Sequence, residues 1–219
     1  MDLPFRIVPV TAYQQNCTVV KCPKTGDIAV IDPGGDLDRI QAAIDDLGGM
    51  PKKILLTHGH LDHVGGTLPL SKNLDVPIIG PHQDDDFWIQ QLPTQAQMLG
   101  LPAVETFTPD QWLKDGDEVV LGELKFEVIH CPGHTPGHVV LFCREYQWAQ
   151  VGDVIFQGSI GRTDFPRGNH QQLLRSIREK LFPLGDDIRF VPGHGPMSSF
   201  GQERLSNPFV GDRAVGQDQ

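Results

Sequence analysis

A dense group of histidines and one carboxylate stands at residues 57–63, with the sequence Thr-His-Gly-His-Leu-Asp-His. It directly follows the apolar run Ile-Leu-Leu at 54–56, so a buried strand would deliver these side chains to one edge of the fold. Neutral imidazoles and carboxylates are ligands that suit Zn, Fe or Mn. The group therefore indicates catalysis by a metal. The plainer alternative is a histidine-rich surface loop in a chain that has 9 histidines.

The spacing within the group has a direct structural meaning. In an extended segment, residues two apart share a face, so His58, His60 and Asp62 would point the same way. His63 breaks this period, and it joins the others only if the chain bends near Asp62, as it would if Asp62 opened a helix. The segment can then serve two ions, one held by the first two histidines and the other by Asp62 and His63.

Three later residues offer further ligands. His134 lies in the stretch Pro-Gly-His, Asp153 in Val-Gly-Asp and His194 in Pro-Gly-His-Gly. Each follows a short apolar run that predicts a strand, and loops at the strand ends of a sheet protein can converge. We therefore expect these three side chains to meet the group at 57–63.

The elements that must position these residues can be read from the apolar pattern. Runs rich in β-branched residues predict strands, and apolar residues at helical spacing predict helices, with Asp36 and Asn169 as candidate N-caps. Turn residues between 108 and 117 divide the chain into two similar halves, about 1–110 and 111–219, of a single domain 1–219. The predicted strands are 5–10, 17–21, 27–31, 54–57, 76–79, 124–128, 139–143, 147–151 and 188–191, and the predicted helices are 37–47, 62–74, 84–98 with a break at Pro93, and the segment after Asn169.

The overall charge limits the partners. The chain has 28 acidic and 18 basic residues, a formal net charge of -10, which argues against nucleic acid and against anionic membranes. A small anionic substrate is still compatible with this charge, because two bound divalent ions would make the site locally positive.

The ends of the chain and its cysteines indicate the compartment. No apolar run approaches the roughly 18 residues of a membrane span, and the start lacks the pattern of a secretory signal. The four cysteines form no C-x-x-C pair, so we expect them to be reduced and mostly structural. These features predict a cytoplasmic protein.

The ordered motifs T-H-G-H-L-D-H, P-G-H-T-P-G-H, V-G-D and P-G-H-G resemble those of the metallo-β-lactamase superfamily. The loop G-S-I-G-R-T-D-F-P-R-G-N at 158–169 and the stretch N-P-F at 207–209 are similar to glyoxalase II-like hydrolases of the short bacterial type. The resemblance covers almost the whole chain. It implies an α/β fold, a four-layer αβ/βα sandwich of two packed sheets with helices outside and metals at one edge.

The resemblance also implies a ligand set and a reaction. Two divalent metal ions are expected, Zn foremost, with Fe or Mn as alternatives, and a hydroxide between them would attack the carbonyl of S-lactoylglutathione or a related hydroxyacyl thioester. The departing thiolate is a good leaving group, so no general acid is required. Asp62 would also orient the hydroxide. By motif, His58, His60 and His134 would hold the first ion, Asp62, His63 and His194 the second, and Asp153 would bridge them.

Two features of the sequence keep other functions open. About 25 residues follow His194, too few for the helical domain with which full-length glyoxalase II enzymes bind glutathione, so no glutathione-binding residues are assigned. The main alternative is a persulfide dioxygenase, an enzyme that uses one iron. Persulfide dioxygenases share the T-H-x-H-x-D-H motif and a stretch similar to residues 161–165. A lactonase, another metallo-hydrolase or a non-catalytic metal-binding protein is disfavoured, the last because no ligand is missing.

The remaining histidines are assigned to supporting or packing roles (His130, His138) and to the surface or helix caps (His82, His170).

Overall fold

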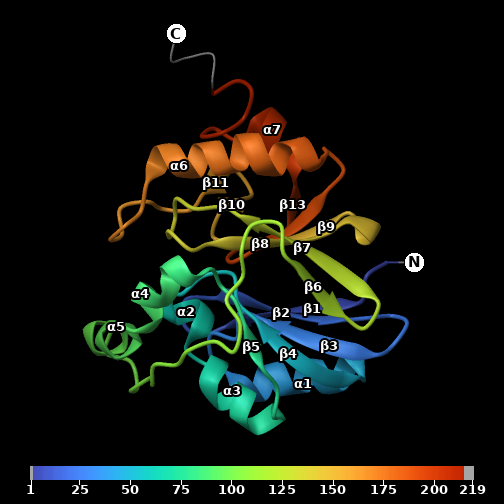
Figure 1. Ribbon diagram of the computed structural model, residues 1–219. Helices are drawn as coiled ribbons and strands as arrows, with labels where there is room; N and C mark the ends of the chain where they lie inside the picture. Colours follow the sequence, from blue (N-terminus) through green and yellow to red (C-terminus); the bar gives the residue numbers. More distant parts are fainter. Residues whose placement is uncertain (1, 215–219) are drawn as a thin grey trace.

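Two β-sheets pack face to face, and helices cover the outer face of each in the computed structural model, which describes residues 2–214 (Figure 1). The first sheet has the order β1-β2-β3-β4-β5, and the second has the order β13-β12-β9-β8-β7-β6. The predicted four-layer αβ/βα sandwich is therefore confirmed. The strands of the first sheet are β1 (Phe5–Val10), β2 (Gln15–Lys21), β3 (Asp27–Ile31), β4 (Met50–Leu55) and β5 (Ile78–Ile79), and those of the second are β6 (Glu118–Leu121), β7 (Leu124–His130), β8 (Val139–Cys143), β9 (Trp148–Gly152), β12 (Arg189–Pro192) and β13 (Ser198–Ser199).

The direction of the strands places the chemistry at one edge. Strands β1 to β3 form the predicted antiparallel meander, whereas β3, β4 and β5 run parallel to one another. In the second sheet β8 and β9 form the predicted hairpin, and β12 lies parallel to β9. The loops that leave β4, β7, β9 and β12 are those that carry the predicted ligands, and the small hairpin β10 (Ile155–Phe156) and β11 (Ser159–Ile160) follows β9.

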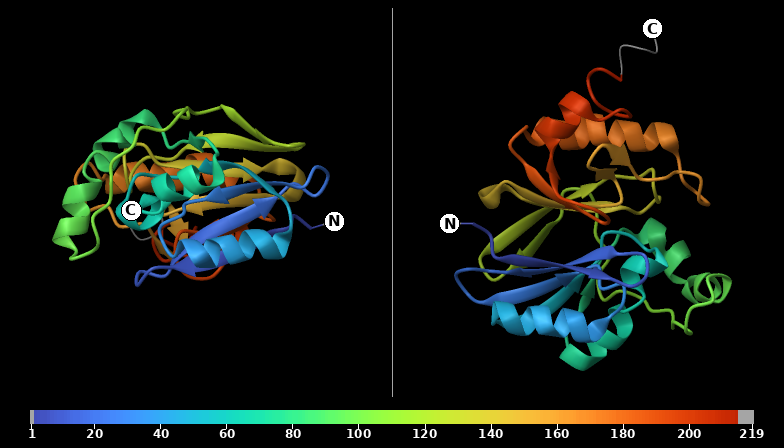
Figure 2. Two further views of the ribbon diagram at one scale, coloured as in Figure 1. Left: turned by 90° about the horizontal axis from the view of Figure 1, so that it is seen from below. Right: turned by 180° about the vertical axis from the view of Figure 1, so that it is seen from behind.

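Helices occupy three positions. Helices α1 (Leu37–Leu47) and α3 (Thr67–Leu74) cover the first sheet, and α6 (His170–Arg175), its π-helical continuation η3 (Ser176–Leu181) and α7 (Phe200–Ser206) cover the second (Figure 1). Helices α2 (Leu61–Val64), α4 (Asp86–Ile89) and α5 (Leu92–Met98) gather at the end of the sandwich away from the N-terminus (Figure 2). The short turns η1 (Gln83–Asp85), η2 (Arg144–Tyr146) and η4 (Phe182–Leu184) complete the elements among residues 2–214.

Three apolar clusters hold the layers together. One lies between the sheets and includes the fully buried Phe126 and the nearly fully buried Trp148, and the other two join each sheet to its helices. Burying apolar surface on both faces of a sheet is the main stabilising contribution in such a sandwich. None of the helices in the described part of the chain combines the length and apolar character needed to cross a membrane.

Several predicted element boundaries are wrong, and the structure gives the physical reason for each error. The helix predicted at 62–74 is interrupted, because the Gly66 N–H bonds to the Pro33 carbonyl (2.9 Å) and leaves no room for a Cβ there. In the segment 84–98 the break precedes Leu92, and Pro93 lies in the first turn of α5, where its missing N–H costs nothing. The predicted strand 54–57 leaves the ladder at Thr57, whose N–H bonds to the Asp32 side chain instead.

Two further details differ from the sequence prediction. His60, not Asp62, precedes α2, so Asp62 is the second residue of that helix. Asp36 does occupy the N-cap position of α1, but its carboxylate accepts a hydrogen bond from Thr11 N (2.8 Å) rather than from the helix. Asn169 caps α6 as predicted, accepting from Gln172 N at 2.9 Å.

Candidate metal centre

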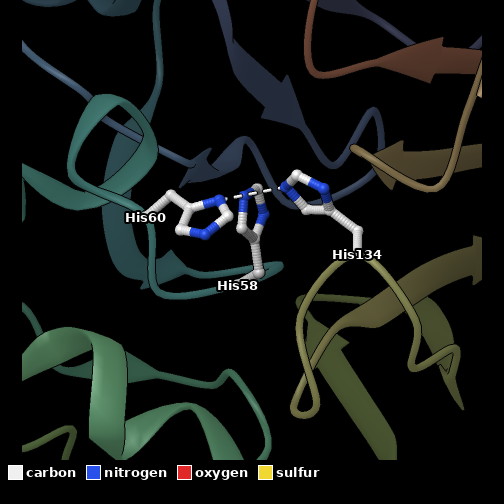
Figure 3. A group of neighbouring side chains, drawn as sticks. All are labelled: His58, His60 and His134. Carbon is white, nitrogen blue, oxygen red and sulfur yellow. Dashed lines mark hydrogen bonds between the residues drawn. The ribbon is translucent and has the colours of Figure 1, made fainter. Parts of the chain in front are cut away.

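Three histidines from both sheets meet at the first candidate ion position. His58 and His60 follow β4, and His134 follows β7 (Figure 3). The His60 Nδ1 and His134 Nε2 atoms are 3.0 Å apart. Two imidazoles that bind one zinc at about 2.0–2.1 Å in a tetrahedron hold their nitrogens about 3.3 Å apart. The separation of these two nitrogens is therefore close to that of two ligands of one ion.

Neighbouring groups decide which ring nitrogens are free of protons. His134 Nδ1 lies 2.7 Å from the Arg162 carbonyl oxygen, which only accepts, so the proton is on Nδ1 and Nε2 has its lone pair. The Thr57 hydroxyl donates to Asp32 and so accepts from His58 Nδ1, 3.1 Å away. His58 Nε2 is left proton-free, as metal ligation requires.

The second candidate position is formed by Asp62, His63 and His194. One oxygen of Asp62 lies 3.1 Å from His194 Nε2 and 3.8 Å from His63 Nε2. His63 Nδ1 lies 3.0 Å from an oxygen of Asp32, so its Nε2 faces the other two ligands. These three residues, like the first three, offer ligand atoms within 4.8 Å of one another.

Asp153 lies between the two groups. One of its oxygens is 3.5 Å from His134 Nε2 and 3.8 Å from His194 Nε2, and the other is 3.3 Å from His63 Nε2. A Cβ on Gly193 would collide with this carboxylate and with the His63 ring, so a glycine is required there for the close approach. Asp153 thus reaches both candidate ion positions, and all seven residues selected from the sequence come together.

The unsatisfied atoms at this centre fit a pair of divalent cations. Nε2 of His58 and His63 and one oxygen of Asp153 are buried without a hydrogen-bond partner. Buried acceptors of this kind are costly unless a cation or a donor faces them. Burial also lowers the pKa of His58 and His134, and that of His60 to about 3, which keeps these rings in the neutral form that binds metal. The donor set of imidazoles and carboxylates is suited to two metal ions.

Two supporting carboxylates were missed by the sequence analysis. Asp32 is fully buried and bonds to Thr57 and His63. Asp85, fully buried at the end of η1, accepts from Gly59 N (2.9 Å), Thr135 Oγ1 (2.7 Å) and Gly137 N (2.6 Å). Burial raises the pKa of Asp85 to about 6.

Asp85 thereby joins the two halves of the centre. Gly59 stands between His58 and His60, whereas Thr135 directly follows His134. One carboxylate therefore fixes the loop of the first sheet to the loop of the second. No sequence signal marked it, because Asp85 is one of three consecutive aspartates in a polar turn.

The other histidines take the supporting, packing, surface or capping places expected for them. His138 accepts a hydrogen bond from Asp153 N (3.0 Å) and stacks on His58 at 4.6 Å, so it supports both ion positions. His170 is exposed, and His82 caps η1 through Asp84 N. His130 stacks on His82.

An aromatic wall borders the first ion position. The Trp88 ring meets His60 edge-on at 4.5 Å, and Phe165 lies 5.0 Å from the same ring. The Arg162 guanidinium lies 4.2 Å from the Phe165 ring centre and is paired with Asp164. The segment 84–98, whose role the sequence left open, thus packs on the core and also lines the centre.

The comparisons with known proteins agree with this geometry. The family model described as the metallo-beta-lactamase superfamily matches residues 10–194, and the chain belongs to that superfamily. At this level the prediction of a metallo-hydrolase is confirmed.

Three known proteins are similar to this chain over nearly its full length. The chain is 47% identical over 211 residues to the hydroxyacylglutathione hydrolase GloC of Haemophilus influenzae, covering 96% of this chain and 99% of the relative. It is similar to the solved structure of TTHA1623 in a di-iron-bound form, with a TM-score of 0.85 and 34% identity over 94% of this chain and 100% of that one. It is also similar to the BLEG-1 B3 metallo-beta-lactamase, with a TM-score of 0.87 and 32% identity over 94% and 99% of the two chains.

Proposed function

We propose that this protein hydrolyses S-lactoylglutathione or a related hydroxyacyl thioester with two divalent metal ions. The observation that carries the proposal is the pair of three-residue ligand groups joined by Asp153. The near full-length similarity to a hydroxyacylglutathione hydrolase supports the choice of substrate class. A small-molecule thioester is the only partner that the proposal requires.

The ions and the residues of the centre have different roles in the proposed reaction. Two divalent ions held by these residues would supply Lewis acidity toward the carbonyl oxygen and a hydroxide nucleophile at neutral pH. Asp62 is the more exposed of the two carboxylates, 24% against 12% for Asp153. Burial alone would raise the pKa of Asp62, but His63 and His194 lower it, so the carboxylate is ionised and can orient the attacking water. The leaving thiolate needs no proton donor.

Zinc is the proposed metal, with iron as the alternative. Imidazole and carboxylate ligands without a thiolate bind either ion. The similar TTHA1623 structure is a di-iron form, which supports testing iron alongside zinc. The four cysteines are free and buried, which suits a reducing compartment, and a cytoplasmic location is part of the proposal.

The main alternative is a persulfide dioxygenase that uses one iron. That reaction requires one ligand group, whereas this chain has a complete second group in Asp62, His63 and His194. The second group therefore favours the hydrolase. Hydrolysis of a β-lactam is a further candidate to assay, because the BLEG-1 structure has a similar fold at 32% identity.

The decisive experiment is loss of the thioester absorbance of S-D-lactoylglutathione without oxygen, using protein whose metal content has been counted. Turnover that rises with metal occupancy and does not need oxygen is expected. A filled centre that is inactive on thioesters but consumes oxygen with a glutathione persulfide would overturn the proposal. A filled centre that cleaves a β-lactam such as nitrocefin and leaves thioesters intact would also overturn it.

A further inference from the structure

A fourth group of metal-ligating side chains lies outside the catalytic centre. Among residues 2–214, four groups of histidines and acids offer ligand atoms within 4.8 Å of one another, and three of them belong to the centre described above. The remaining group is His82, Asp84 and His130. None of these three residues contributes to the proposed thioester hydrolysis.

The hydrogen bonds of this group leave one ring nitrogen of each histidine without a proton. His130 Nε2 lies 2.8 Å from the Pro136 carbonyl oxygen, so Nε2 carries the proton and Nδ1 keeps its lone pair. His82 Nδ1 accepts from Asp84 N at 3.2 Å, so it also lacks a proton. This nitrogen lies 3.4 Å from an oxygen of the Asp84 carboxylate.

That separation fits two ligands of one ion. The His82 Nδ1 lone pair now accepts from the Asp84 N–H, and an ion bound there would replace that hydrogen bond. Ligands of a tetrahedral zinc at about 2.0–2.2 Å are about 3.3–3.5 Å apart. The His82 and His130 rings are 4.4 Å apart and nearly parallel, at 22°. Because the rings are stacked, both lone pairs reach one ion only if the His82 ring, whose side chain is 22% exposed, turns out of the stack.

The surrounding charges favour a cation. Lys180 is a positive group beside the site, and it donates to the His130 carbonyl at 2.7 Å. Its charge is offset by Asp115, 3.3 Å away, whose carboxylate also accepts from His130 N. Asp84 therefore adds a net negative charge at the group, and solvent would supply the remaining ligands of a bound ion.

We propose that His82, Asp84 and His130 form a third, solvent-accessible site for a divalent transition metal, separate from the catalytic pair. Two imidazoles and one carboxylate select zinc, nickel, cobalt or copper over magnesium or calcium. Three protein ligands with water completing the shell should bind more weakly than the buried catalytic centre. A backbone hydrogen bond joins the site to the loop that carries His134, because His82 N donates to the Gly137 carbonyl at 3.1 Å.

The test uses zinc itself and the whole protein. Protein with its catalytic ions bound is equilibrated with micromolar free zinc, and bound metal is counted before and after a weak chelator. One further, chelator-labile equivalent per chain is expected in the wild type. His130→Gln and Asp84→Asn should each lose that equivalent, with at least a tenfold weaker affinity, while the two tightly bound ions and thioester turnover remain. His170→Gln removes an exposed imidazole elsewhere and should keep the equivalent.

A second measurement needs no variant. Diethyl pyrocarbonate acylates accessible proton-free imidazoles, and zinc at the third site should protect His82 and His130 while His170 reacts at the same rate with and without zinc. The absence of a third equivalent, its persistence in both variants, or equal labelling of His82 and His130 with and without zinc would each overturn the proposal.

Discussion

An oxygen of Asp32 lies 3.0 Å from His63 Nδ1, and neither side chain is exposed to solvent. The carboxylate only accepts when ionised, so the proton of the His63 ring is on Nδ1 and Nε2 is directed at Asp62 and Asp153. Asp32 is held in turn by Thr57, through both its backbone N–H and its hydroxyl. One carboxylate therefore sets the tautomer of a ligand at the second ion position and the orientation of Thr57 beside His58.

Asp32→Asn should weaken the second ion more than the first. The amide can place its NH₂ group against His63 Nδ1 and so favour the wrong tautomer, and loss of such a supporting partner costs about 10–100-fold in metal affinity. The measurement is metal content at a series of free zinc concentrations. Asp38→Asn, on the exposed face of α1, is the matched control. Unchanged binding of both ions in Asp32→Asn would contradict the role of Asp32.

Asp85→Asn should loosen the link between the two ligand loops. The three donors Gly59 N, Thr135 Oγ1 and Gly137 N face a single carboxylate, and an amide would turn its NH₂ group toward at least one of them. An unsatisfied buried donor costs about 1–3 kcal/mol of the free energy of unfolding. Denaturant unfolding of metal-free protein measures this loss, and the affinity for zinc should fall as well.

The control for Asp85→Asn is Asp86→Asn, a neighbouring carboxylate that only accepts from Gln90 Nε2 on the surface of α4. This substitution should leave stability and zinc affinity within error of the wild type. Equal effects of the two substitutions would mean that Asp85 does not join the loops.

The ligands of the centre were predictable from the sequence because their pattern is local. His58, His60, Asp62 and His63 lie within six residues of one another, and the other three ligands follow recognisable strands. Strands such as β2, β8 and β9 were predictable from their apolar runs because they are buried along most of their length, whereas the two-sheet sandwich was predicted from the family resemblance.

The supporting residues were not predictable in the same way. Asp32 bonds to a histidine 31 positions away, and Asp85 bonds to Gly137, 52 positions away. Such bonds depend on how loops meet in space, and a lone aspartate in a turn has the same local pattern whether it is exposed or buried. The break after Val64 was likewise missed because its cause, the Pro33 carbonyl, lies on another loop.

Asp153→Asn should reduce the occupancy of both ion positions together. The carboxylate approaches His134 of the first group and His63 and His194 of the second, and an amide removes its negative charge from both. The loss of affinity should be at least the roughly 10–100-fold that follows removal of an outer partner. Metal content and thioester turnover are measured on the same samples. Full turnover with two bound ions would show that Asp153 does not bridge them.

Acidification should release the two ions in a fixed order. Burial alone would lower the pKa of His63, but Asp153 and Asp62 raise it well above the usual histidine value, and Asp62 and Asp153 likewise raise the pKa of His194 against the effect of burial. In contrast, burial lowers the pKa of His58 and His134, and that of His60 to about 3.

Metal and proton compete for the same ring nitrogens, so a raised pKa means that protons displace the ion at a higher pH. As pH falls, the ion held by Asp62, His63 and His194 should be lost first, beginning above the ordinary histidine pKa of about 6.5. The ion held by His58, His60 and His134 should persist well below that pH. Stepwise dialysis with metal counting at each pH measures the order. Release of the first ion before the second, or of both in one step, would contradict the assignment of the two ligand groups.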